Sequence, residues 1–277
     1  MLLGVLSVSG ASILFQYATA EPLVVALYRL AFSVVLLAVP LLRQRNSRIS
    51  RRDLGLSLLS GVFLALHFGT WFFSLKLTSV ASSTVLVTMH PFIVLLYGYF
   101  AWGERTRGRA LAGVLMAVAG AMLVSWGDFR LSSTALLGDL LALLGAVTVS
   151  GYFLIGRHVR QRVSAVQYST LAYTSAAVVL LAASLAWGSP LSGFAPVNWW
   201  LFAALAVFPT IFGHTLFNWA LKFVPASVIS VSILGEPIGA SILAWLIWGK
   251  VPGPLNLVGG TLILIGIGLF QWRRETT

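Results

Sequence analysis

The sequence contains no cysteine at all. This absence excludes disulfides, thiolate catalysis and cysteine-ligated metal sites. Charge is scarce as well, because charged residues make up only 9% of the 277 residues and just seven of them are acidic. Soluble domains carry about 25% charged residues, since water must solvate their surface. A chain this poor in charge cannot cover a globule with polar groups, so its outer surface must face lipid.

Motifs of enzyme chemistry are also missing. The sequence has no GxSxG nucleophile elbow, no HExxH zinc motif and no P-loop. An intramembrane enzyme would need clustered catalytic groups, whereas the polar residues within the apolar runs are spread singly. We therefore predict a protein that is not an enzyme and that has no cofactor. The short loops also offer no dock for a nucleotide-binding partner, so any process that the chain carries out must be passive or coupled to an ion gradient.

What the chain does have is long apolar runs, with 58% hydrophobic residues and a mean hydropathy of +0.94. A helix needs about 20 mostly apolar residues to cross the hydrocarbon of a membrane. The first run has no basic segment before it, and we interpret it as a membrane helix rather than a signal peptide. Ten predicted spans fall near 2–18, 23–42, 54–75, 79–102, 109–126, 135–156, 165–187, 198–220, 227–248 and 254–272.

Basic residues predict the orientation of these spans. The net charge is +11, and the 18 Lys and Arg residues gather in the gaps between apolar runs. If the N-terminus is cytoplasmic, inside gaps hold 14 of them and outside gaps hold 3, with Arg29 left inside a span. The positive-inside rule then places both termini in the cytoplasm. We interpret the basic clusters as a signal at the lipid surface and expect no nucleic-acid partner.

The two halves of the sequence repeat each other at a constant offset of 146 positions. The matches involve lysine, proline, tryptophan and glycine, whereas chance matches between apolar helices involve leucine, valine and alanine. The repeat pairs Leu75-Lys76 with Leu221-Lys222, Pro91 with Pro237, Trp102-Gly103 with Trp248-Gly249, Gly113 with Gly259, and Gly120 with Gly266. Each copy holds five spans, an odd number, so the second copy enters the membrane from the opposite side.

Inverted repeats recur in secondary transporters, because two oppositely facing halves can exchange conformations around a central site. We therefore predict an all-α membrane protein of ten transmembrane helices, arranged as two inverted five-helix repeats around a central cavity. The first repeat covers residues 1–130 and the second covers residues 131–277.

The last two spans of each half carry a family resemblance. The fourth run reads TVLVTMHPF over 84–92 and closes with Trp102-Gly103-Glu104-Arg105, while the ninth contains LGEP over 234–237 and closes with Trp248-Gly249-Lys250. Both stretches resemble the EamA repeat of the drug/metabolite transporter superfamily, and the resemblance covers essentially the whole chain. Two positions depart from the family pattern: His90 stands where an acid often precedes the proline, and Lys250 stands where glutamate often follows the glycine.

The resemblance implies a multi-pass protein of the bacterial inner (plasma) membrane that moves an amino acid or similar metabolite outward. Within the superfamily the aromatic richness looks most like the amino acid exporters of the YddG type. It further implies a site lined by spans 1–4 and 6–9, with spans 5 and 10 outside the central pathway. The glycine pairs Gly113/Gly120 and Gly259/Gly266 are each seven residues apart, and we expect them to pack these outer spans against their neighbours.

Two prolines mark the first candidate site residues. His90-Pro91 and Glu236-Pro237 occupy equivalent midpoints of spans 4 and 9. Proline removes a backbone donor and kinks the helix, and an intramembrane polar group turns to the bundle interior. We expect His90 and Glu236 near the middle of the bundle as a substrate or proton site. The alternative is that the prolines only shape the helices and that both side chains are satisfied internally.

Spans 3 and 8 carry further candidates at helical spacing. His67 and Trp71 are four residues apart, as are His214 and Asn218, so each pair shares a helix face. We expect all four to line the cavity, with hydrogen bonding between helices as the alternative. A pair of histidines can indicate a metal, but no Asp, Glu or Cys accompanies either one at ligand spacing. We therefore predict no metal site.

Tyr28 and Tyr97 complete the predicted substrate-binding set. Tyr97 lies towards the cytoplasmic end of span 4, where tyrosine commonly meets lipid headgroups. Tyr28 neighbours Arg29, which lies about two turns inside span 2, beyond easy snorkelling, and needs an acceptor. A substrate carboxylate is one candidate acceptor. The other is a helix C-terminus, which we favour.

The leading functional hypothesis is a secondary transporter that exports small organic metabolites, aromatic or other neutral amino acids, by alternating access. A pocket with few charges suits an amphipathic solute. One alternative is a sugar-phosphate or nucleotide-sugar carrier of the same superfamily, which would need several central Lys or Arg residues where Arg29 stands alone. A channel is another. Proton coupling through Glu236 and the histidines is a separate hypothesis, and the expected partners are the solute and the lipid bilayer.

Overall fold

The structure is a computed structural model that describes residues 1–44, 49–103, 108–126, 132–249, 251 and 253–271. The described part is helical throughout and contains no strand. The predicted boundary between the two repeats, at 130/131, lies outside the described residues. So do several residues behind the predicted orientation and family resemblance, namely Arg45, Arg48, Glu104, Arg105, Arg107, Arg130, Lys250, Arg273 and Arg274.

Helices occupy all ten of the predicted apolar runs. In the first half they are α1 (Leu2–Ser9), α2 (Ala11–Tyr17), α3 (Pro22–Arg43), α4 (Arg51–Leu77), α5 (Val80–Val87), α6 (His90–Trp102) and α7 (Gly108–Ser125). In the second half they are α8 (Ser133–Val159), α9 (Ala165–Trp187), α10 (Pro196–Leu205), the π-helix η2 (Ala206–Thr215), α11 (Leu216–Ala220), α12 (Ala226–Ile233), α13 (Glu236–Trp248) and α14 (Pro254–Gln271).

Eight of the described helical segments are long and apolar enough to cross a membrane. Two shorter apolar segments, Leu2–Tyr17 and Gly108–Val124, occupy the first and fifth predicted runs. The chain is therefore a multi-pass, all-α membrane protein. Eight spans meet the length of a crossing, and the count of ten stays a prediction.

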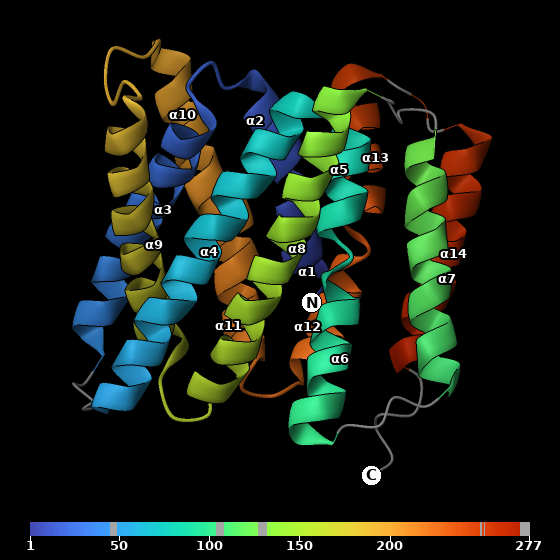
Figure 1. Ribbon diagram of the computed structural model, residues 1–277, viewed down its shortest axis with the longest axis horizontal. Coiled ribbons are helices and arrows are strands. Elements are labelled where there is room, and N and C mark those ends of the chain that lie inside the picture. Colours follow the sequence, from blue (N-terminus) through green and yellow to red (C-terminus); the bar gives the residue numbers. More distant parts are fainter. Residues whose placement is uncertain (45–48, 104–107, 127–131, 250, 252, 272–277) are drawn as a thin grey trace.

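The connections alternate between two ends of the bundle (Figure 1). Those that follow α3, α8 and α11 share one end, and they carry basic residues such as Arg51, Arg162 and Lys222. Lys76 lies at the opposite end, in the last turn of α4. The basic residues of the described connections are thus concentrated at one end. Which side of the membrane this end faces stays a prediction.

Two helices are interrupted halfway, each just before a proline. The residues Thr88 and Met89 separate α5 from α6, and Leu234 and Gly235 separate α12 from α13. In both breaks a tight turn replaces the helical bond, with Phe92 N donating to Met89 O and Ile238 N donating to Gly235 O, each at 3.1 Å. Proline cannot donate its own backbone bond, so the helix restarts there. The breaks confirm the predicted disruption at Pro91 and Pro237.

A third irregularity is the π-helix η2, which has Pro209 inside it. Two threonine hydroxyls donate hydrogen bonds to backbone carbonyls in and next to this wider helix. Thr210 Oγ1 donates to Leu205 O at 2.8 Å, and Thr215 Oγ1 donates to Thr210 O at 3.1 Å. The wider turn holds one residue more than an α-helical turn. His214 lies 147 positions after His67, so the two histidines are not at equivalent positions under the repeat offset of 146.

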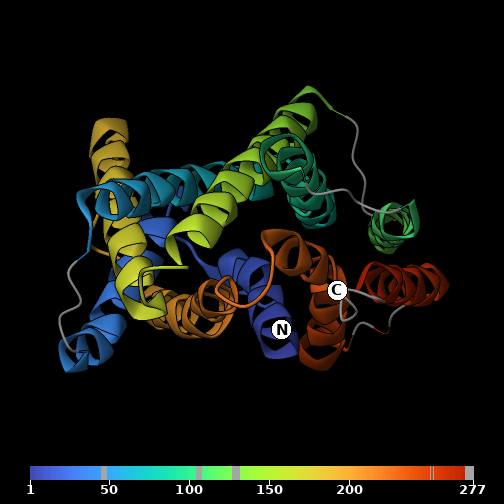
Figure 2. The ribbon, with the colours of Figure 1, turned by 90° about the horizontal axis from the view of Figure 1, so that it is seen from below.

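The pair α7 and α14 stands at one edge of the molecule, away from the main bundle (Figure 2). The two helices meet at glycine. A side chain at Gly120 would place its Cβ 2.5 Å from Gly259 O, and one at Gly113 would place it 2.6 Å from Gly266 O. Small residues let the backbones approach this closely. The glycine contacts confirm the predicted packing role of all four residues.

This contact predicts that a larger side chain at Gly266 destabilises the protein. The Cβ of Gly266→Val would lie 2.5 Å from Gly113 O and 2.6 Å from Ala117 N, so the two helices must move apart. Overpacking of this kind costs about 1–3 kcal/mol. Gly268→Val is the matched control, because Gly268 is on the same helix and has nothing within 4 Å of its Cβ position. Thermal unfolding in detergent should separate the variants, and equal midpoints would contradict the packing role.

Candidate functional site: a buried cavity at the broken helices

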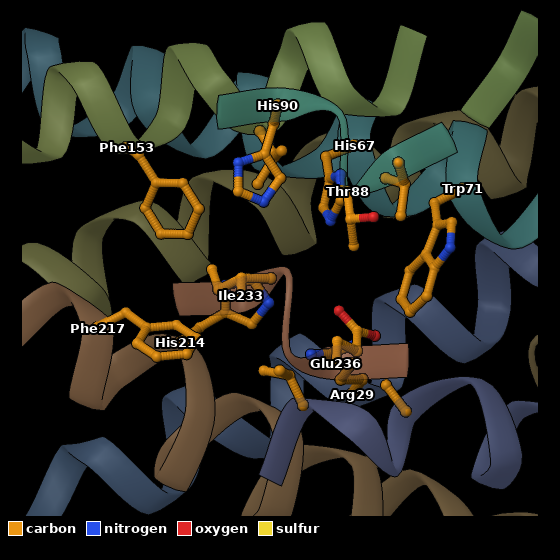
Figure 3. A pocket seen from close by; sticks show the side chains of 14 residues that line it. Arg29, His67, Trp71, Thr88, His90, Phe153, His214, Phe217, Ile233 and Glu236 are labelled. Carbon is orange, nitrogen blue, oxygen red and sulfur yellow. The ribbon is translucent and has the colours of Figure 1, made fainter. Parts of the chain in front are cut away.

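A cavity of about 40 Å³ lies in the middle of the bundle, where both broken helices restart (Figure 3). Its walls come from α1 to α4, from the α5–α6 and α12–α13 breaks, and from α8, η2 and α11. The lining side chains are Val8, Ala11, Arg29, His67, Trp71, Val87, Thr88, His90, Val149, Phe153, His214, Phe217, Ile233 and Glu236. Among the described residues, α7 and α14 contribute nothing to this wall.

Five of the eight predicted substrate-binding residues line this cavity. His67 and Trp71 come from α4, His90 from the start of α6, His214 from η2, and Glu236 from the start of α13. All five side chains are less than 8% exposed. Residues as far apart in sequence as His67 and Glu236 thus meet in one cavity, and their role in binding stays a prediction.

The other three predicted residues lie elsewhere in the fold. The Tyr28 hydroxyl donates to Leu191 O at 2.6 Å, and its ring stacks on Phe202. Asn218 sits in a buried network, and Tyr97 is 47% exposed on the outer surface of α6. The structure therefore does not bring Tyr28, Tyr97 or Asn218 to the cavity wall.

Arg29 is the lining residue whose setting the sequence did not reveal. We expected its guanidinium to pack against a helix C-terminus, but its Nε donates to the side-chain oxygen of Thr210 at 2.7 Å. The guanidinium carbon lies 4.1 Å from the centre of the Phe68 ring, a cation–π contact. Arg29 is fully buried, and its two terminal nitrogens have no hydrogen-bond partner. The sequence signal that marks this residue is a basic side chain about two turns inside an apolar span.

Glu236 carries the acidic group of the cavity. Its carboxylate points into the space between the walls (Figure 3) and is 5% exposed. Both Glu236 and Arg29 are described, yet no N–O distance of 4.0 Å or less joins them. The two side chains therefore line the same cavity without forming an ion pair.

Aromatic rings make up much of the remaining wall. His67 stacks on Trp71 with centroids 5.9 Å apart, and His214 stacks on Phe153 at 6.4 Å. The Nδ1 of His67 lies 3.0 Å from Gly145 O, and because a carbonyl oxygen only accepts, this nitrogen carries the proton. That arrangement leaves Nε2 of His67 as the nitrogen available for other partners.

Among the described residues no group of three or more His, Cys, Asp or Glu side chains is close enough together to hold a metal ion. Glu236 and the three histidines lie as separate polar groups in a mostly apolar wall. Such a wall with a few placed polar groups is typical of sites for small organic ligands.

One end of the bundle is held by arginines in the last turn of α8 and in the α8–α9 connection. Arg162 forms an ion pair with Asp53 at the start of α4, with Nη2 2.6 Å from the carboxylate. Its hydrogen bond to Asp53 raises the pKa of Arg162. Arg160 Nε donates to Asn218 O at 2.8 Å, and Arg157 donates to Leu221 O at 3.0 Å. These cations meet the carbonyls at the end of α11, where a helix favours positive charge.

A buried polar network around Asn218 lies between the cavity and this end. The Asn218 side-chain oxygen accepts from the Tyr152 hydroxyl at 2.8 Å, and its nitrogen donates to Ser169 Oγ at 2.9 Å. A tyrosine pair continues the network, since the Tyr168 hydroxyl donates to Tyr152 O at 3.2 Å. These hydrogen bonds connect α8, α9 and α11, so Asn218 joins three helices.

We therefore expect Asn218→Leu to reduce stability without changing the apparent affinity for the transported solute. Leucine would leave the Tyr152 and Ser169 hydroxyls buried without their partner, which costs about 1–3 kcal/mol for each unsatisfied group. Thermal unfolding of the purified protein tests the loss of stability, and the KM of transport tests the unchanged affinity. Tyr152→Phe removes the same bond from the other side and should shift the melting temperature in the same direction. A raised KM with unchanged stability would instead support substrate contact.

Comparison with known proteins defines the class. The sequence matches the EamA-like transporter family twice, over residues 1–126 and 136–271. The chain belongs to the EamA-like transporter family. Membership points to transport rather than to enzyme chemistry.

Named relatives span nearly the whole chain. The pseudopaline exporter CntI of Pseudomonas aeruginosa is 27% identical over 260 residues, which are 94% of this chain and 89% of that protein. An uncharacterized transporter of Archaeoglobus fulgidus is 26% identical over 256 residues, or 91% of this chain and 87% of that one. The uncharacterized transporter YxxF of Bacillus subtilis is 24% identical, covering 83% of this chain and 74% of its own length.

A solved structure, titled only as the crystal structure of a protein, shares the fold. It superposes with a TM-score of 0.82, covers 100% of this chain and 97% of its own, and is 19% identical. At that identity the match shows the fold alone. The narrower resemblance to amino acid exporters of the YddG type stays a prediction.

Proposed function

We propose that this protein is a secondary transporter that exports a small organic metabolite by alternating access around the central cavity. The observation that carries the proposal is that both sequence halves contribute side chains to one buried space, at the broken helices that begin with His90 and Glu236. Discontinuous helices at mid-membrane are the usual setting of transporter sites. The exporter among the relatives supports outward movement of a small metabolite.

Two inverted five-helix repeats, residues 1–130 and 131–277, explain this arrangement. The breaks before Pro91 and Pro237 have the same hydrogen-bond pattern, 146 positions apart. The following half-helices end alike, at Gly103 with φ of 64° and Gly249 with φ of 67°, a conformation that favours glycine. The family matches twice, once in each half. In a bacterial plasma membrane, the basic end of the bundle would face the cytoplasm.

The size of the cavity supports a moving structure. A space of about 40 Å³ holds a few water molecules, each of which needs roughly 10–15 Å³. Sites for small organic ligands have roughly 300–1,000 Å³. The halves must therefore separate to admit a metabolite, and the two breaks and η2 supply backbone that can bend without losing a full helical ladder.

We infer that the transported metabolite is an amino acid, aromatic or otherwise neutral, or a close relative of one. The wall is dominated by apolar and aromatic groups such as Trp71, Phe153 and Phe217. A sugar phosphate or nucleotide sugar would call for several cations, whereas Arg29 is the one Lys or Arg on the described wall. A channel of the same fold is the remaining alternative.

Counterflow in proteoliposomes tests the function. Vesicles that hold the purified full chain and are loaded with one unlabelled amino acid should accumulate the same labelled amino acid from outside, with a rate that saturates. The largest accumulation is expected for phenylalanine, tyrosine or tryptophan, and empty vesicles are the control. Flux that rises linearly with concentration would indicate a channel. The absence of accumulation for every amino acid would contradict the substrate class.

Proton coupling through Glu236 is a separate proposal. Glu236 is the acidic group on the cavity wall, so its protonation would change the charge of the site. We expect Glu236→Gln, which keeps the shape but not the charge, to remove most of the dependence of transport rate on pH. Glu21→Gln is the matched control, because Glu21 is an exposed residue at the start of α3. An unchanged pH profile in Glu236→Gln would rule out Glu236 as the coupling group.

A further inference from the structure

Arg29 and Glu236 form a separated pair of opposite charges on the cavity wall. Both lie on the lower wall in Figure 3, facing His67, Thr88 and His90. The guanidinium has two terminal nitrogens without hydrogen-bond partners, and the carboxylate accepts no hydrogen bond from any described residue. Buried charges are normally paired and hydrogen-bonded because an unpaired charge away from water is costly. The site therefore holds one basic and one acidic side chain that still have hydrogen-bonding atoms without a partner among the described residues.

The neighbouring side chains hold the Arg29 guanidinium in place but do not bond all of its N–H groups. The bond from Nε to Thr210 and the contact with the Phe68 ring hold one edge and one face of the group. The opposite edge, with Nη1 and Nη2, is left to bond something else. This edge presents two parallel N–H groups, the geometry that binds a carboxylate in bidentate fashion.

The backbone fixes the carboxylate in a similar way. Glu236 is the first residue of α13, next to Pro237, so its position is set by the break rather than by a side-chain bond. An ammonium group offers three N–H donors in a compact charge. It could bond the carboxylate while a neighbouring group of the same molecule reached Arg29.

We propose that Arg29 binds the carboxylate and Glu236 binds the ammonium group of a zwitterionic substrate, with the substrate's side chain against the aromatic wall. The inference rests on the proposed transport function and names the head-group contacts within it. A zwitterion satisfies both charges at once. A simple anion would leave Glu236 unpaired, and a simple cation would leave Arg29 unpaired, each at the cost of an uncompensated charge in a membrane interior.

Competition binding tests this assignment on the purified full chain in detergent. The probe is radiolabelled L-phenylalanine, or whichever amino acid gives the largest counterflow. Its competitors are the same molecule without the ammonium group, 3-phenylpropanoate for phenylalanine, and the same molecule without the carboxylate, 2-phenylethylamine. Because each lost contact is a charge-assisted hydrogen bond, we expect either analogue to bind at least about tenfold more weakly than the amino acid.

Two variants assign each contact to its residue. Glu236→Gln should weaken amino acid binding at least about tenfold while leaving 3-phenylpropanoate within about twofold, because that analogue has no ammonium group to lose. Arg29→Gln should show the converse pattern with 2-phenylethylamine, and Arg29→Lys, which keeps the charge, should recover part of the affinity. Exposed residues supply the matched controls, Glu21→Gln for the acid and Lys222→Gln for the base. Elution on size exclusion shows whether each variant is folded.

The outcomes separate this inference from the function that it rests on. If wild-type protein shows saturable counterflow but binds the two analogues as well as the amino acid, the charge assignment is wrong and the transport function stands. The same holds if Glu236→Gln weakens the amino acid and 3-phenylpropanoate equally, which would indicate a merely structural role. If no amino acid shows counterflow, the substrate class and this inference fall together. If Arg29→Gln does not fold, the Arg29→Lys and Glu236→Gln patterns decide.

Discussion

This structure depends on one constraint. Where no water is available, each backbone amide must make its hydrogen bond within the protein. In hydrocarbon each unsatisfied backbone group costs several kcal/mol, so a spanning segment is helical unless protein or a polar space covers the exception. The exceptions in the described chain are few and they coincide. The breaks before His90 and Glu236 border the cavity, and so does η2 through His214. Irregular backbone is thus found where side chains from several helices surround it.

The same constraint explains how much of the fold could be predicted from the sequence. Apolar length and breaker residues locate helices because the bilayer imposes both, and the structure has helices in all ten apolar runs. Pro91 and Pro237 locate the breaks because proline lacks the amide hydrogen that the ladder needs. The eight segments that meet the length of a crossing fall short of ten because α1 to α2 and α7 are short. Hydropathy records apolar length but not how deep a short helix sits.

The site was less predictable, because a helical position gives a face but not what that face meets. Tyr28 and Asn218 are residue types that can line a polar cavity. In the structure, however, the Tyr28 hydroxyl donates to Leu191 O, and the Asn218 side-chain oxygen accepts from the Tyr152 hydroxyl. Arg29 resembled a residue held by helix carbonyls, yet its guanidinium donates to the side chain of Thr210 in the π-helix and contacts the ring of Phe68. The π-helix η2 could not be inferred from the repeat, because the matched positions of the two halves begin only at Leu75 and Leu221, after η2. Register shifts of one residue decide such contacts, and they are set by tertiary packing.

The duplicated backbone and the single-copy charges serve different needs of one transporter. Exchange between two facing states favours halves of similar shape, and the matched breaks and glycine ends provide that similarity. Recognition of a substrate with unlike ends requires the halves to differ. At the offset of 146, Glu236 corresponds to His90, and Arg29 is the one Lys or Arg on the described cavity wall. Each charge of the cavity is therefore present in one half only, so the symmetric frame surrounds a polar site with two distinct poles.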